Sequence, residues 1–318
     1  MLGLAGRATL VTGVLVAGLW TATHQVAGVS WAEVGSLLTQ VPVGRLVLLT
    51  ALWLGGLAIY AVVLASALPG LGYGRSLLLN LSGSAVSNVV PLGGAAGTAL
   101  NWRMVTRWGY SNASFVAFCV LTNLLDVLTK LVLPLVAVGG LLLVSVHVPR
   151  MVWTVAGACA AALVVVVLLP LLSRWFGPLR RLDRLRGSVV RVRDLLQERW
   201  APLLAGSAAY IAAQVLLLDV SLHTVGLQPA LAVVVTAAAL ERLATLVPVT
   251  PGGAGVAELG AIAWLVAAGL PPVGVVAGVV LCRVFLVVLE VPLGGALLAG
   301  WAWHVRRGAA VPRLQVGA

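Results

Sequence analysis

LATLVPVTPGGAGVAELG, residues 243–260, interrupts one of the long apolar runs of this chain with prolines, glycines and a carboxylate. Pro248 and Pro251 each lack a backbone donor, and the glycines permit turn geometry that a regular helix excludes. Irregular backbone at membrane depth is tolerated only where protein buries it or where it lines a wet cavity. The stretch is therefore predicted to form the tip of a re-entrant hairpin and half of a binding site, with Glu258 close to that tip.

The rest of the chain has the composition of an all-α polytopic membrane protein. Of its 318 residues, 61% are apolar and only 9% are charged, and the mean hydropathy is +1.09. A soluble domain has about 25% charged residues. The long apolar runs exclude an outer-membrane barrel, whose strands need only about ten alternating residues. The net charge of +11 is almost all arginine. Arginines in the connecting segments and at the chain ends of a membrane protein set its topology and attract anionic lipid. We therefore expect no nucleic-acid partner.

Residue sets that would carry enzyme chemistry are not evident. Cys119, Cys159 and Cys282 fall inside apolar runs and read as small core residues rather than disulfide partners or metal ligands. There is no Ser/His/Asp or Cys/His set, and the glycine-rich stretches lack the Lys-Ser/Thr of a nucleotide-binding loop. We therefore expect no enzyme activity, no metal and no cofactor.

The apolar runs divide the chain into two repeats, each with three spans and a broken re-entrant hairpin. The first repeat, residues 1–147, is predicted to contain spans at about 8–23, 43–64 and 113–146 and a hairpin at 74–103. The second, residues 148–305, is predicted to contain spans at about 152–172, 203–223 and 273–298 and a hairpin at 231–269. Residues 306–318 form a tail. A signal peptide is the alternative for 8–23. The run at 113–146 exceeds the roughly 20 residues of one span, so Pro134 and the Gly139–Gly140 pair are predicted to kink or break it.

Residues 174–199 are rich in arginine, with eight arginines against Asp183, Asp194 and Glu198. Apolar residues recur there every three or four positions, at Trp175, Leu179, Leu182, Leu185, Val189, Val192 and Leu196. This period predicts an amphipathic helix in the headgroup plane, with its arginines toward anionic lipid. A merely positive loop that fixes orientation is the alternative. Either way, the arginine distribution places this segment and both termini in the cytoplasm of a bacterial cell, whose inner membrane the chain spans.

The two halves resemble each other at an offset of about 159 residues. The matches are Pro91 with Pro251, Gly93 and Gly94 with Gly252 and Gly253, and Gly109 with Gly269. Because each half crosses the membrane an odd number of times, a tandem repeat must be inverted. Inverted repeats with broken helices near the midplane are typical of alternating-access transporters. A chance match between glycine-rich stretches is the alternative.

Ionisable residues inside the apolar runs are the candidate site, because such groups are costly in a membrane and usually serve a function or pair structurally. An arginine in a dry cavity suits a phosphate, since its planar fork donates two parallel hydrogen bonds. We predict that Arg242 and Arg283 bind a lipid phosphate while Glu258 positions one of them. Backbone amides of the glycine tips add donors. A closed Glu–Arg network that only joins helices is the alternative. The predicted substrate-binding residues are Arg283, Arg242, Glu258, Arg103, Gly252, Gly253, Gly255, Gly93, Gly94 and Asn88.

The remaining buried charges are predicted to be structural or coupling groups. Asp126 and Lys130 stand four residues apart, a spacing typical of an ion pair within one helix. Glu241 points about 100° away from its neighbour Arg242 on a helix and needs a partner elsewhere. Glu290 follows Arg283 by seven residues, which predicts a similar face of the last span.

These residues resemble a known family. The pattern of Pro248, Pro251-Gly252-Gly253, Gly255, Glu258, Gly269 and Arg283 looks like the lysylphosphatidylglycerol synthase transmembrane region, also described as flippase-like integral membrane proteins. Asn88, Pro91, Gly93-Gly94, Arg103 and Asp126 are similar to the first-half hallmark of that family. The resemblance covers about residues 8–305. Many members carry an acidic residue where this chain has Ala95-Ala96 and an arginine where it has Asn123, so the first half lacks those contributions.

The resemblance implies a role in lipid transport without aminoacylation, because the chain lacks the soluble transferase domain of the lipid-aminoacylating members. We expect a flippase-like transporter that moves an anionic phospholipid or a polyprenyl-phosphate-linked lipid between leaflets. The alternative is a non-transporting scaffold that presents lipid to a separate glycosyl- or aminoacyl-transferase. The expected partners are therefore a membrane lipid with an anionic headgroup and a membrane-associated transferase. The sequence does not indicate an oligomeric state.

Overall fold

The structure, a computed structural model, describes residues 28–90, 93–144, 148–172, 183–246 and 255–307. The predicted span at 8–23, residues 91–92 and 247–254 of the two predicted hairpins and almost all of the tail lie outside these ranges. All regular structure within them is helical, which confirms the all-α class. The helices are α2 (Trp31–Thr39), α3 (Val43–Ala67), α4 (Tyr73–Val89), α5 (Gly93–Arg107), α6 (Asn112–Leu143), α7 (Arg150–Leu172), α8 (Asp183–Thr224), α9 (Leu231–Ala244), α10 (Val256–Ala267), α11 (Pro272–Arg283), the π-helical turn η3 (Val284–Val288) and α12 (Glu290–Arg306).

Four stretches among the described residues are long and apolar enough to cross a membrane. They are α3, α6, the part of α8 from Arg191 to Thr224, and the continuous run from Pro272 to Arg306. A helix of 25 residues, the length of α3, rises about 38 Å, which exceeds the roughly 30 Å of a bilayer hydrocarbon core. The protein is therefore a helical membrane protein.

Helix α6 is continuous, so of the kink or break that was predicted there, the break does not occur. It continues from Asn112 to Leu143 through Pro134. Proline removes only one backbone hydrogen bond, and neighbouring helices in membrane proteins compensate for that loss. Gly140 also packs close to Ala232 of α9, where a Cβ would approach the Ala232 Cβ to 3.3 Å. Gly140 therefore allows close packing of α6 on α9 rather than forming a turn.

The arginine-rich segment is helical where it is described, and it continues directly into the following predicted span. Together they form α8, with non-helical backbone angles at Arg199 marking a kink. Val192 is buried, and Leu195 and Leu196 pack against a core cluster formed by α3, α5 and α6. Part of the apolar face that was expected to meet lipid therefore meets the protein itself.

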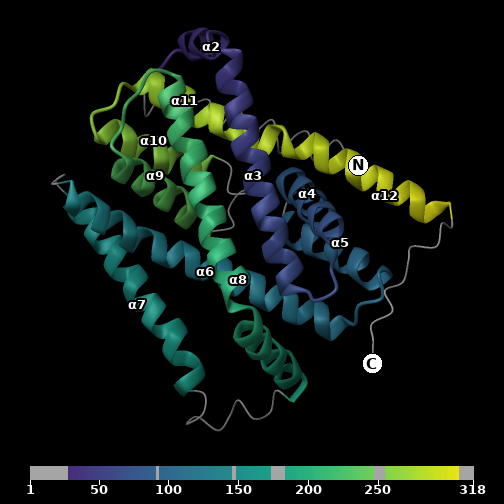
Figure 1. Cartoon of the computed structure of the whole chain (residues 1–318). Helices are drawn as coiled ribbons and strands as arrows, with labels where there is room; N and C mark the ends of the chain where they lie inside the picture. Colours follow the sequence, from purple (N-terminus) through teal and green to yellow (C-terminus); the bar gives the residue numbers. More distant parts are fainter. Residues whose placement is uncertain (1–27, 91–92, 145–147, 173–182, 247–254, 308–318) are drawn as a thin grey trace, which may run out of the picture.

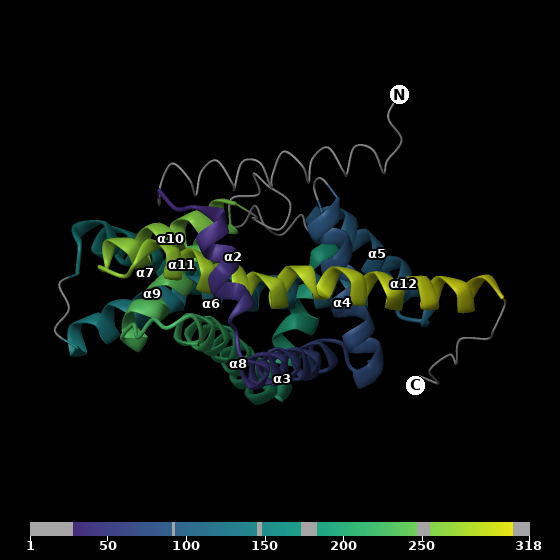
Figure 2. The ribbon, with the colours of Figure 1, turned by 90° about the horizontal axis from the view of Figure 1, so that it is seen from above.

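The helices pair reciprocally between the two halves of the chain (Figures 1 and 2). α3 lies beside α8, α4 packs against α12, and α9 packs against α6. α4 also packs against α5, and α9 packs against α10. Thus α4 and α9 occupy equivalent positions: each contacts the helix that follows it and a long helix of the other half.

Two helix ends repeat the same geometry. Gly109 after α5 and Gly269 after α10 have positive φ angles of 96° and 89°. The next amide in each half, from Tyr110 and from Leu270, donates to the carbonyl five residues back at 3.3 Å. This is the Schellman arrangement, in which glycine tolerates the left-handed conformation. α6 and α11 then begin at residues 112 and 272. The two helix ends and the two helix starts are therefore separated by the same offset as the matching glycines of the sequence.

Helix α4 makes very close contacts with glycines of two other helices, α5 and α12. A Cβ on Gly93 would overlap the backbone carbonyl of Ser87, and the Ser87 hydroxyl donates to the Gly93 carbonyl at 3.0 Å. A Cβ on Gly294 of α12 would overlap the Leu81 carbonyl of α4. These contacts fix the position of α4, which supplies polar side chains to the cavities described next.

Candidate functional site

A polar cavity of about 210 Å³ lies between α3, α4, α6, α8 and α9. Most of the helices around it are candidate membrane spans, so polar side chains there are shielded from bulk water on several sides. The cavity is lined by Tyr60, Val63, Asn80, Ser84, Thr122, Leu125, Asp126, Thr129, Ser207, Tyr210, Ile211 and Arg242. It brings together residues of two predicted elements, Asp126 of the span at 113–146 and Arg242 of the hairpin at 231–269.

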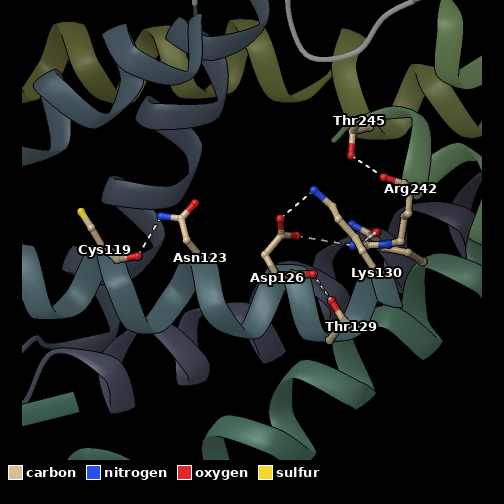
Figure 3. A network of polar contacts seen from close by, with 8 residues as sticks. Cys119, Asn123, Asp126, Thr129, Lys130, Arg242 and Thr245 are labelled. Atoms are coloured by element: carbon tan, nitrogen blue, oxygen red, sulfur yellow. Dashed lines mark hydrogen bonds and ion pairs between the residues drawn. The ribbon is translucent and has the colours of Figure 1, made fainter. Parts of the chain in front are cut away.

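Asp126 is the centre of a charged group in this cavity (Figure 3). Its carboxylate pairs with Lys130 Nζ at 2.6 Å and lies 3.8 Å from Arg242 Nη1. The Arg242 guanidinium also donates to the Gln214 side-chain oxygen. The pair predicted from the spacing of Asp126 and Lys130 is therefore present, and it has a third member from another helix.

The charges of this group do not cancel. One carboxylate faces two cations, Lys130 and Arg242, which leaves an excess of one positive charge. The Asp126 side chain is 42% exposed, whereas those of Lys130 and Arg242 are 11% and 16% exposed. Arg242 occupies the last turn of α9, where the helix dipole favours a cation. Asp126 and Arg242 line the cavity, whereas Lys130 does not. Because Lys130 already pairs with Asp126, Arg242 is the member of the group best placed to attract an anion into the cavity.

A second polar cavity, of about 240 Å³, adjoins the first and shares Tyr60, Asn80, Ser84 and Thr122 with it. It lies between α4, α5 and α6 and extends toward the beginning of α5. Asn88 and Gly94, both predicted site residues, line it together with Gly97, Thr98 and Asn101. Amide and hydroxyl groups therefore line a path from the end of α4 to the charged group at Asp126.

Arg283 lies in a different charged group. Its Nη2 is 2.6 Å from Glu241 Oε1, and its Nε is 3.0 Å from Glu258 Oε1. The other Glu258 oxygen accepts from the Gly255 amide at 2.7 Å. Gly255 has a φ of 91°, which glycine adopts without strain, and it begins α10. Glu258 thus joins the start of α10 to the guanidinium on α11, as the sequence predicted for one of the two arginines.

The Arg283 group is less suited to a phosphate than the Arg242 group. Two carboxylates surround one guanidinium, which leaves an excess of one negative charge. The side chains of Arg283, Glu241 and Glu258 are 18%, 17% and 8% exposed, and none of them lines the polar cavities. This arrangement fits the closed Glu–Arg network that was the alternative for these residues.

The last span contains a feature without a sequence signal. The π-helical turn η3 separates Arg283 from Glu290. A π turn takes one additional residue, so residues beyond it are rotated by about 100° relative to a continuous α-helix. Glu290 accordingly lies away from the Arg283 group and accepts from Trp53 Nε1 of α3 at 3.4 Å. The similar face predicted from their spacing is wrong for this reason.

The remaining predicted site residues lie outside the two charged groups. Gly93 packs against Ser87, and Arg103 is exposed on α5, outside both polar cavities. Gly252 and Gly253 lie outside the described residues.

Sequence reasoning missed several polar side chains that line the first cavity or border it. Tyr60 and Tyr210 stack with ring centroids 4.5 Å apart, and Asn80, Ser84 and Gln214 lie nearby. Asn80 and Ser84 belong to a polar stripe of α4 in which Ser76, Asn80, Ser84 and Asn88 recur every four residues, and this spacing was the available signal.

Comparison with known proteins places the chain in a family. None of the curated proteins compared with it matches the chain. The family described as the lysylphosphatidylglycerol synthase TM region matches residues 7–294, which include every helix that contributes to the two polar cavities and to the Arg283 group. That match covers most of the protein, and the chain belongs to the lysylphosphatidylglycerol synthase TM region family.

Proposed function

We propose that the protein moves an anionic lipid between the leaflets of the bacterial inner membrane, with the lipid phosphate held by Arg242. One observation carries this proposal: Arg242 lines a polar cavity among membrane helices, and its carboxylate neighbour Asp126 lies 3.8 Å away and is already paired with Lys130 at 2.6 Å. A headgroup that crosses a membrane needs such a polar path while its tails remain in hydrocarbon. The proposed orientation has both termini in the cytoplasm, following the arginine-rich segments.

The reciprocal helix pairing supports an inverted repeat as the basis of this movement. A two-fold relation that exchanges α4 with α9 and α6 with α11–α12 reproduces the observed contacts of α4 with α12 and of α9 with α6. The same relation places α3 against its counterpart α8. In inverted-repeat transporters the substrate binds between the repeats near the midplane. We propose that α4–α5 and α9–α10 are re-entrant hairpins of this kind.

The proposed site uses Arg242 rather than Arg283 for the phosphate. Arg242 makes only a long contact with Asp126, so an incoming phosphate competes with one exposed carboxylate. Asp126 then keeps Lys130 in place and repels a second anion. The protein needs no catalytic group for this role, and we propose that it is not an enzyme.

The test is lipid translocation by the purified protein in vesicles that contain fluorescent phosphatidylglycerol. Arg242→Gln is expected to reduce the rate by about tenfold to hundredfold, because a charge-assisted hydrogen bond is worth about 1.5–3 kcal/mol. Arg103→Gln removes the same charge from an exposed position on α5 and is the matched control, expected to leave the rate unchanged. Vesicles with fluorescent phosphatidylcholine show whether the loss depends on the anionic head.

Two results would overturn the proposal. Wild-type protein that binds phosphatidylglycerol without moving it would be a scaffold for a separate transferase. Equal rates for Arg242→Gln and wild type would remove the charged cavity from the path.

A further inference from the structure

We infer that a groove between α6, α8 and α9 holds a hydrocarbon chain of the transported lipid, so that the lipid enters sideways through this face. The groove has a volume of about 690 Å³, in the range typical of ligand sites. Among the described residues that line it, Thr129 and Ser207 are the only polar ones and none is charged. This inference rests on the proposed function, because the charged cavity supplies the headgroup site.

The groove and the polar cavity adjoin each other. Leu125, Thr129, Ser207 and Ile211 line both. Thr129 and Ser207 carry hydroxyl groups, so they mark the boundary between the polar lining of the cavity and the apolar lining of the groove. A molecule that occupies both spaces therefore has a polar end beside Arg242 and an apolar remainder between α6 and α8. A lipid, with its polar headgroup and apolar chains, has this distribution of polar and apolar parts.

The groove faces outward along its length. Its rim residues Val136, Leu216 and Leu231 are 56%, 44% and 60% exposed, whereas its floor residues Leu133 and Val215 are each 8% exposed. A chain there has protein on one side and the bilayer on the other, so it can remain in hydrocarbon while its head enters the cavity.

The length of the groove also fits. Its lining extends over residues 125–136 of α6 and 204–216 of α8. At 1.5 Å per residue these stretches rise about 16 Å and 18 Å, close to half of the roughly 30 Å hydrocarbon core. The groove therefore matches the depth over which the chains of one leaflet extend.

The test uses a phosphatidylglycerol with a photoreactive diazirine midway along one chain, added to the full-length protein in nanodiscs. Wild-type protein is expected to give cross-links on groove residues such as Val136 and Leu216. In Ala212→Trp, an indole fills the groove without touching the polar cavity, and these cross-links are expected to be lost together with translocation. Ala209→Trp is the matched control, because Ala209 is also exposed on α8 but lies outside the groove. It is expected to retain both, and thermal unfolding of each variant shows whether it is folded.

The contrary results separate the groove from the proposed function. If wild-type protein translocates the lipid but cross-links form away from the groove, the groove is not the chain site and the charged cavity remains. If the two tryptophan variants lose translocation equally, the groove again fails. If Val136→Cys forms a disulfide between two copies while the lipid probe stays out, a second copy occupies the groove. If wild-type protein neither binds nor moves the lipid, the proposed function fails, and the chain site fails with it.

Discussion

Arg283→Met is expected to destabilise the protein by about 3–5 kcal/mol, the cost of removing one member of a buried ion-pair group. The substitution leaves Glu241 and Glu258 facing each other, each at most 17% exposed, without the cation that both contact. Glu258 also holds the start of α10 through the Gly255 amide, so repulsion between the carboxylates weakens that helix end. The measurement is thermal unfolding of the purified protein in detergent.

Restoring charge balance should recover this stability. The triple variant Arg283→Met, Glu241→Gln, Glu258→Gln removes all three charges, and its unfolding temperature is expected to return most of the way to wild type. A glutamine at position 258 still offers an oxygen to the Gly255 amide. Arg103→Met, at an exposed position, controls for the loss of an arginine. Equal stability of Arg283→Met and wild type would show that the ion pairs contribute nothing to the fold.

Two neighbouring glycines of α12 are expected to respond with opposite signs to the same substitution. Gly294→Ala places a methyl group against the Leu81 carbonyl and the Ala85 side chain, so α12 and α4 must separate. Overpacking of this kind costs about 1–3 kcal/mol. Gly295 has open space around its Cβ position, and Gly295→Ala is expected to stabilise the helix by about 0.5–1 kcal/mol.

Unfolding temperatures of the two single variants and of wild type check this prediction. The difference in sign is the informative quantity, because both substitutions add the same atoms to the same helix. A loss of stability in both variants, or in neither, would contradict the close approach of α4 and α12. Since α4 carries Asn80 and Ser84, Gly294→Ala is also expected to slow translocation, whereas Gly295→Ala is not.

The sequence predicted much of the helix order because its signals there are local. Schellman glycines at 109 and 269 and the matching starts of α6 and α11 follow from residue types near each helix end. The pair of Asp126 and Lys130 needs only one helix, so its spacing was sufficient to predict it.

What the sequence could not predict depends on which helices become neighbours. Arg242 and Arg283 look alike in an apolar run, yet one contacts a single exposed carboxylate and the other contacts two. The π turn after Arg283 carries no residue signal, since Val284–Val288 is an ordinary apolar stretch, and it moved Glu290 to another face. Pro134 predicted a kink or a break, yet α6 continues through it, and Pro134 is buried.

The adjacency of Glu241 and Arg242 has a mechanical consequence. These consecutive residues at the end of α9 belong to oppositely charged groups, one beside α10 and α11 and the other beside α6. Because a single helical turn carries both side chains, any twist of that turn displaces both together. The backbone between Glu241 and Arg242 thus couples the Arg283 group to the Asp126 group directly, without intervening side chains.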